Sequence, residues 1–389
     1  MKKLLPCFLI FLLLTGCGVL PSQLATEATT DTIETPLPPE TALPSPTQVT
    51  TPGYTWDIVD QLLSEMTIED RVGQILLARC NAETALSDID TYHLGGFVLF
   101  GADFADQTPE SFRKKADNYQ SASPVPMILS VDEEGGDVTR ISRYAPFRSS
   151  KFPSLRKSWT AGGLSQILEI EEEKCGLLGS LGINVNLGPV CDLSDDPDAF
   201  MYNRSLGQSA ETTAQVVGDI LRLYEANGIG TVLKHFPGYG NNADTHVGLA
   251  RDSRSLQTLE GRDLIPFAAG IDAGAEAILV SHNIVEALDR QLPASLSPAV
   301  HTYLRETMGF SGLILTDDLF MQAITDEYGV EEAAVLALLA GNDMLCVTEY
   351  AQQYNAILEA VYSGRIPYET LDNAARNVLK WKKSLGLLS

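Results

Sequence analysis

The chain has few basic residues for its length of 389: 27 lysines and arginines stand against 51 aspartates and glutamates, a formal charge of −24. Proteins that bind nucleic acid neutralise its phosphates with lysine and arginine, so this composition argues against a nucleic-acid partner. It argues equally against electrostatic docking on anionic lipid. Because 44% of the residues are apolar, the chain can bury a large core, which excludes global disorder.

Cysteine is also scarce. The chain has six, and none of them shows the CxxC spacing of zinc or redox sites. After Cys7 and Cys17, the remaining cysteines lie far apart and mostly within apolar, strand-like runs: Cys80, Cys175, Cys191 and Cys346. We expect them to be small buried side chains, with a disulfide or a metal site as the alternative.

The apolar run at the N-terminus, Leu4 to Leu14, is too short to cross a bilayer core of about 30 Å. Two lysines precede it, which is the layout of a secretory signal. Leu14-Thr15-Gly16-Cys17 resembles a bacterial lipobox. We therefore expect residues 1–16 to be a lipoprotein signal peptide and Cys17 to be lipidated, which would anchor the protein outside the cell on the membrane. An ordinary cleaved signal with a chance cysteine is the alternative.

Residues 17–54 form a Thr/Pro-rich segment without lysine or arginine. Between Pro21 and Pro52 lie seven prolines, nine threonines and no aromatic residue. Such a segment cannot bury enough apolar surface to offset its chain entropy. We expect a disordered tether, and a passive spacer is favoured over a segment that binds a partner.

Residues 55–389 alternate apolar, strand-like runs with helical patterns. The predicted strands are Gln74–Cys80, Gly95–Phe100, Pro126–Val131, Ile183–Val190, Thr231–His235, Ala277–Ser281, Gly312–Thr316 and Asp343–Val347. The predicted helices include Glu211–Ala226, Leu256–Ala273, Ser297–Met308, Val330–Ala340 and Leu371–Lys382. Eight strands separated by helices predict an α/β fold, a single (β/α)8 TIM-like barrel. A doubly wound open sheet is the alternative, because strand order is invisible in sequence.

Polar residues cluster directly after these strands, where barrel enzymes carry their chemistry. The strand ends read VDEEGG from Val131, KHFPGYG from Lys234, and TDDL from Thr316. A single aspartate after a strand is often a helix cap, but polar groups at six strand ends are hard to assign to capping.

KHFPGYG followed by Asp244-Thr245-His246, with VDEEGG upstream and TDDL downstream, resembles family 3 glycoside hydrolases. More closely, the pattern resembles the β-N-acetylglucosaminidases that trim cell-wall fragments, over about residues 60–385. The resemblance implies a (β/α)8 barrel. It also implies hydrolysis of a terminal β-linked GlcNAc with retention, through a glycosyl–enzyme intermediate.

The resemblance implies that Asp317 is the nucleophile, with the neighbouring Asp318 as the alternative. It implies that His246 is the general acid/base and that Asp244 is the carboxylate paired with it. A carboxylate can attack the anomeric carbon and leave again, and an imidazole can give and take the proton.

The same resemblance assigns the sugar-holding residues as Asp132, Arg204, Lys234 and His235. The acid can accept from sugar hydroxyls, while the bases donate to them. Arg140 matches a position that in relatives faces an attached muramyl unit.

Two residues depart from the family pattern. Tyr239 replaces a histidine and is expected to alter loop packing. Asp137 replaces an arginine, which removes a positive charge near the substrate entrance.

We expect no metal and no cofactor. The expected partners are a GlcNAc-containing saccharide and a lipid bilayer, reached through lipidated Cys17, with no nucleic acid, and the chain is expected to be a monomer. The alternatives are a glycoside phosphorylase or a β-glucosidase with the same nucleophile, and a sugar-binding lipoprotein without catalysis.

Overall fold

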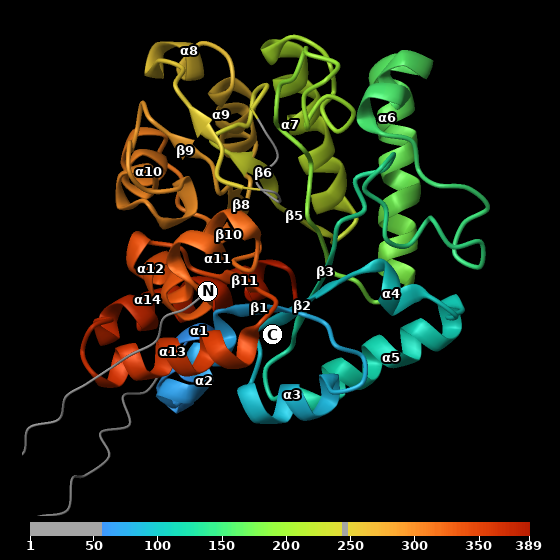
Figure 1. Ribbon diagram of the computed structural model, residues 1–389. Coiled ribbons are helices and arrows are strands. Elements are labelled where there is room, and N and C mark those ends of the chain that lie inside the picture. Colours follow the sequence, from blue (N-terminus) through green and yellow to red (C-terminus); the bar gives the residue numbers. More distant parts are fainter. Residues whose placement is uncertain (1–56, 243–247) are drawn as a thin grey trace, which may run out of the picture. The chain divides into compact units, whose positions relative to one another are not determined.

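Short buried strands and helices alternate through residues 57–242 and 248–389, which the computed structural model describes (Figure 1). The strands are β1 (Leu76–Arg79), β2 (Gly96–Leu99), β3 (Ile128–Val131), β4 (Val185–Asn186), β5 (Gly230–Thr231), β6 (Leu233–Phe236), β7 (Arg251–Asp252), β8 (Ala277–Val280), β9 (Ile284–Val285), β10 (Leu313–Thr316) and β11 (Leu345–Val347). The predicted signal peptide, Cys17 and the tether lie outside the described residues, as do Asp244 and His246.

The helices lie around the strands (Figure 1). They are α1 (Ile58–Glu65), α2 (Ile68–Gln74), α3 (Ala85–Tyr92), α4 (Gly101–Phe104), α5 (Pro109–Ala122), α6 (Leu155–Ser180), α7 (Ala210–Ala226), α8 (Leu256–Glu260), α9 (Leu264–Asp272), α10 (Pro298–Thr302), α11 (Gln322–Tyr328), α12 (Val330–Ala340), α13 (Tyr350–Tyr362) and α14 (Tyr368–Ser384). Several begin after a serine whose hydroxyl accepts a backbone N–H of the first turn, as Ser209 does for α7.

The sheet is parallel, and its strands follow one another in chain order. One part runs β11-β1-β2-β3-β4-β5 and another runs β10-β8-β6, with parallel pairing throughout. Single parallel bridges, Val190 with Lys234 and Leu315 with Met344, connect the two parts. The chain therefore has an α/β fold with a central parallel sheet, and the pairing runs round it in the order of a TIM barrel.

The predicted strand Thr231–His235 is divided in the structure. β5 pairs with β4, while β6 pairs with β8, so the backbone changes partner at Val232. The predicted strand Ile183–Val190 shortens to β4, because its pairing with β3 covers only the two residues Val185 and Asn186.

The predicted helix bounds agree best with the structure where the helical spacing of apolar residues is uninterrupted. The prediction for α12 matches its bounds, Val330–Ala340. The predicted helix Leu256–Ala273 is two helices, because α8 ends at Glu260 with Gly261 as its C-cap and α9 begins at Leu264. Among the described residues, no helix is long and apolar enough to cross a membrane.

The core lies between the strands and their covering helices. Its fully buried members include Leu76, Phe97, Val131, Leu315 and Leu338. The four cysteines of the described residues are free and buried, which confirms the expectation of small core side chains. Burial raises the pKa of the Cys80 and Cys175 thiols to about 12, so both stay protonated.

One buried base makes stability depend on pH. Lys382 of α14 is fully buried, and its Nζ donates to Gln74 Oε1 at 2.6 Å. Burial lowers the pKa of Lys382 to about 7. An unfolded lysine has a pKa of about 10.4, so above pH 7 the unfolded chain binds the extra proton and stability rises with pH. Urea titrations should show this lysine adding about 2 kcal/mol to the unfolding free energy between pH 7 and pH 9.

Lys382→Met should abolish that rise. Lys380→Met, an exposed change on the same helix, should retain it. An equal pH slope in wild type and Lys382→Met would show that the amine is not held neutral.

Candidate active site

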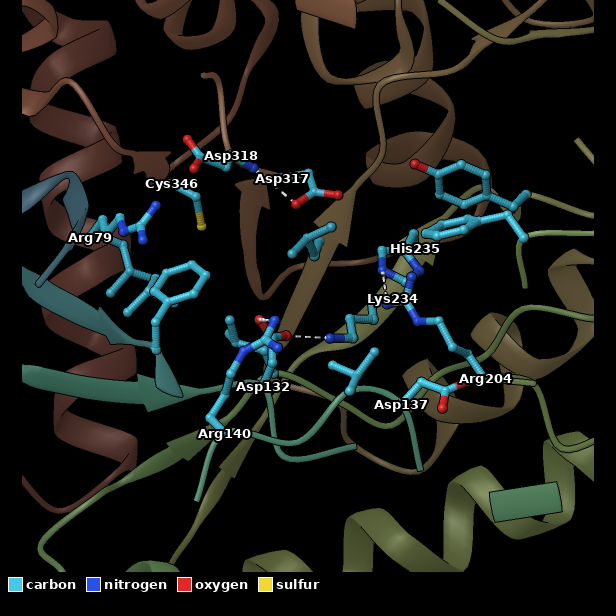
Figure 2. A pocket seen from close by; sticks show the side chains of 18 of the residues that line it. Arg79, Asp132, Asp137, Arg140, Arg204, Lys234, His235, Asp317, Asp318 and Cys346 are labelled. Carbon is cyan, nitrogen blue, oxygen red and sulfur yellow. Dashed lines mark hydrogen bonds and ion pairs between the residues drawn. The ribbon is translucent and has the colours of Figure 1, made fainter. Parts of the chain in front are cut away.

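A cavity of about 500 Å³ opens at the carboxyl ends of the strands. Its walls come from β1, β2, β6, β8 and β11 and from residues that follow β3, β4 and β10, and Figure 2 shows side chains that line it. The structure brings six of the predicted site residues together here: Asp132, Arg140, Arg204, Lys234, His235 and Asp317. A cavity of this size suits a small ligand.

Lys234 lies at the floor of the cavity with its side chain only 3% exposed. Its Nζ contacts Asp132 Oδ1 at 2.6 Å and Glu134 Oε1 at 2.7 Å. Burial alone would lower the pKa of Lys234, but the two carboxylates outweigh it and raise that pKa. Lys234 is therefore a fixed cation held between two acids.

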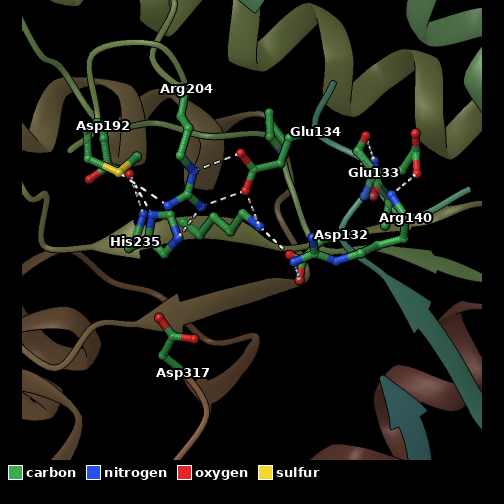
Figure 3. Close-up of polar contacts among 12 residues, drawn as sticks. Asp132, Glu133, Glu134, Arg140, Asp192, Arg204, His235 and Asp317 are labelled. Atoms are coloured by element: carbon green, nitrogen blue, oxygen red, sulfur yellow. Dashed lines mark hydrogen bonds and ion pairs between the residues drawn. The ribbon is translucent and has the colours of Figure 1, made fainter. Parts of the chain in front are cut away.

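Arg204 reaches the same glutamate from the loop before α7 (Figure 3). Its Nη2 and Nε donate to Glu134 Oε1 and Oε2 at 2.7 and 3.0 Å, a bidentate pair. Burial favours the neutral acid, yet Arg204 and Lys234 outweigh it and lower the pKa of Glu134. Glu134 thus links the two buried cations, Arg204 and Lys234.

His235 is oriented by one acceptor and one donor. Its Nδ1 lies 2.7 Å from Asp192 Oδ2, and its Nε2 lies 3.1 Å from Arg204 Nη2. Arginine has only donors, so Nε2 must accept and Nδ1 must carry the hydrogen that it gives to Asp192. Asp192 also accepts the backbone N–H groups of His235 and Tyr239. The imidazole is consequently fixed as one neutral tautomer.

The two adjacent aspartates after β10 differ in their contacts. Asp318 accepts from Thr348 Oγ1 at 2.5 Å and from the backbone N–H of Phe320 at 3.0 Å. Burial raises the pKa of Asp318 first of all, and the charge of Asp317 adds to it. Asp317 accepts the backbone N–H of Asp318 at 2.9 Å and faces the Lys234 side of the cavity (Figures 2 and 3). Asp318 is thus held by neighbouring groups, while Asp317 lies at the cavity.

Arg140 closes the other side of Asp132. Its Nη2 lies 3.6 Å from Asp132 Oδ2, and its guanidinium lies over the Phe100 ring, 5.4 Å from the centroid. Its backbone N–H donates to the carboxylate of Glu133, which is fully buried and also accepts from Ile141 and Ser142. Glu133 thereby fixes the segment that carries Arg140.

Sequence reasoning missed three groups that shape the site. Glu134 lies inside the VDEEGG motif, and its proximity to Asp132 was the available signal. Asp192 follows the fourth predicted strand, where polar residues were expected to gather. Nothing in the sequence marked Phe100 as a site residue, because an aromatic residue at the end of an apolar run usually belongs to the hydrophobic core.

His282, which the motifs did not explain, has a structural role. It is fully buried, with Nδ1 at 2.7 Å from Ser295 Oγ and Nε2 at 3.0 Å from the backbone oxygen of Asp318. Within the described part of the chain, no group of three or more possible metal ligands is found.

Comparison with known proteins gives one consistent family. The profile described as "Glycosyl hydrolase family 3 N terminal domain" matches residues 67–381. The beta-hexosaminidase LpqI of Mycobacterium tuberculosis is 32% identical over 325 residues, 80% of this chain and 82% of that protein. The beta-hexosaminidase of Xanthomonas campestris pv. campestris is 34% identical over 303 residues, 75% of this chain and 87% of that protein.

Solved structures agree with the sequence comparison. The structure of a glycoside hydrolase family 3 beta-N-acetylglucosaminidase from Paenibacillus sp. superposes with a TM-score of 0.78 and 31% identity. The superposition covers 83% of this chain, which spans 63% of that longer chain. The structure of M. tuberculosis LpqI has a TM-score of 0.75 and 29% identity, with 82% of this chain and 95% of that chain covered.

Proposed function

This chain belongs to glycoside hydrolase family 3 and is a glycoside hydrolase of the beta-hexosaminidase type, and from that premise we propose a retaining exo-β-N-acetylglucosaminidase. Its substrates would be cell-wall-derived fragments or related glycans with a terminal β-linked GlcNAc. The observation that carries the proposal is Asp317, which faces the joined cluster of Asp132, Lys234, Arg204 and His235 across one cavity.

In the first half of the proposed reaction, an Asp317 oxygen attacks the anomeric carbon from the face opposite the leaving group. The bond to the aglycone oxygen breaks, and His246, paired with Asp244, gives that oxygen a proton. In the second half, water gives its proton to His246 and attacks the same carbon, and Asp317 leaves. The roles of Asp244 and His246 rest on the KHFPGYG…DTH pattern, because both lie outside the described residues.

The sugar-holding roles follow from the charges on the cavity floor. Lys234 and Arg204 offer N–H donors that stay charged because Glu134 and Asp132 balance them. Asp132 is partly exposed and can accept from a sugar hydroxyl. A site built from such fixed groups holds the ring in place before the attack, which is how positioning lowers the barrier.

Release of nitrophenol from the β-GlcNAc and β-glucoside derivatives, with and without phosphate, tests the proposal. Turnover of the GlcNAc derivative, with the β-anomer of GlcNAc appearing first by NMR, is expected. Appearance of the α-anomer first would contradict retention. No turnover of either derivative would contradict the proposal that the protein is an enzyme of this type. Formation of GlcNAc 1-phosphate would instead identify a phosphorylase.

We propose the chain organisation from the sequence alone: a signal peptide over residues 1–16, lipidated Cys17 and a linker to residue 54, and a catalytic domain over residues 55–389. The protein would then be anchored on the extracytoplasmic face of the membrane. Cys17→Ala should move the protein from the membrane fraction to the soluble fraction, whereas unchanged fractionation would contradict lipid anchoring.

A further inference from the structure

Asp137 differs from the other acids of the cavity because its charge is unmatched. It is exposed and lines the same cavity as Asp317. Asp132 pairs with Lys234, and Asp318 accepts two hydrogen bonds. Within residues 57–242 and 248–389, the Asp137 carboxylate makes no hydrogen bond or ion pair. It is therefore an acid with its full binding capacity left for a ligand.

The position of Asp137 is fixed by the turn that carries it. The backbone N–H of Gly135 donates to Val138 O at 3.0 Å, and that of Gly136 donates to Phe152 O at 2.8 Å. Both glycines have positive φ, +102° and +66°, and a Cβ on Gly135 would lie 2.2 Å from Pro153 O. The turn thus fixes the backbone at Asp137 beside the cavity.

Neighbouring cations do not cancel this charge. Arg204 lies on the same side of the cavity in Figure 2, but its guanidinium is already paired with Glu134. Arg79 and Arg140 lie on the opposite side and face the Phe100 ring, with centroid distances of 4.5 and 5.4 Å. Asp137 and the two arginines beside Phe100 therefore line different sides of the cavity, and Arg140 already faces Asp132 at 3.6 Å.

We infer that Asp137 is a specificity-determining residue that binds a positively charged amine on the aglycone. The favoured aglycone would be a glucosamine unit whose amino group is not acetylated, because an ammonium supplies the missing charge and hydrogen-bond donors together. Asn203 also lines this cavity and offers an amide oxygen to the same group. The inference rests on the proposed function, since it names the substrate class of that same site.

Three disaccharides with GlcNAc β-linked to glucosamine, to glucose or to GlcNAc test the inference. They differ only at carbon 2 of the aglycone, so the ratio of their kcat/KM values isolates that group. We expect wild type to favour glucosamine over glucose by about fivefold, the range of an exposed ion pair. Asp137→Asn should bring the ratio close to one, and Asp137→Arg should reverse it.

Asp90→Asn is the matched control, because it removes one exposed acid on α3 that does not line the cavity. It should keep the wild-type preference. A wild-type ratio of one, or an unchanged ratio in Asp137→Asn, would overturn the inference. Wild-type turnover of nitrophenyl β-GlcNAc, which has no amine, separates that failure from failure of the proposed function.

Discussion

Asp317→Ala is expected to lower kcat/KM for nitrophenyl β-GlcNAc by at least about 10⁴-fold, since loss of a nucleophile removes the covalent route altogether. The fold should survive, because Asp317 is partly exposed at a strand end and its carboxylate accepts the backbone N–H of the next residue. Steady-state kinetics, with circular dichroism to verify folding, measures the loss.

Azide distinguishes a lost nucleophile from a distorted site. In Asp317→Ala the small anion can occupy the space of the carboxylate and attack the anomeric carbon, which releases nitrophenolate and forms an α-glycosyl azide. Asp318→Ala is the matched control, because the Asp318 carboxylate is engaged by Thr348 and the N–H of Phe320. A larger loss and azide rescue at position 318, with little loss at 317, would reverse the assignment.

Lys234→Met should reduce both activity and stability. The change leaves the carboxylates of Asp132 and Glu134 without the cation that contacts each of them within 2.7 Å. Removing one partner of a buried pair costs about 3–5 kcal/mol of unfolding free energy. If Lys234 donates to the sugar as proposed, its loss should lower kcat/KM further, by about 10³-fold in all. Denaturant titration measures the loss of stability, and steady-state kinetics over a range of substrate concentrations measures the loss of kcat/KM.

Lys174→Met provides the comparison, because Lys174 forms a buried pair with Glu171 at 2.7 Å but does not line the cavity. A similar loss of stability with a much smaller loss of kcat/KM is expected. Equal losses of kcat/KM in both variants would mean that Lys234 acts only through the fold.

The strand positions could be predicted because each parallel strand, buried on both faces, is a continuous apolar run. The division between β5 and β6 could not, since a change of pairing partner at Val232 depends on strands distant in sequence. The site residues were predicted from the resemblance to a known family, and six of these residues lie together in the structure. The nucleophile and acid/base assignments stay predictions.

The contacts of Glu134 show why the VDEEGG motif alone did not identify this glutamate as a site residue. VDEEGG places two glutamates side by side, and only the three-dimensional arrangement directs one to Lys234 and Arg204 and the other to the segment after Val138. The role of each of two adjacent acids depends on which loops contact it in the folded protein. The spacing of residues in the sequence does not show which loops these are.

In the glycine turn that carries Asp137, the backbone path tolerates little substitution, whereas the exposed side chain at position 137 can be replaced. Any side chain at Gly135 would meet Pro153 O, and one at Gly136 would lie 2.8 Å from Ser154 Cβ, so the backbone path tolerates little change. Asp137 itself is exposed, and its carboxylate makes no hydrogen bond or ion pair with the part of the chain that the structure describes. A substitution at position 137 would therefore change the charge beside the cavity while the contacts of Glu134 with Lys234 and Arg204 stay intact.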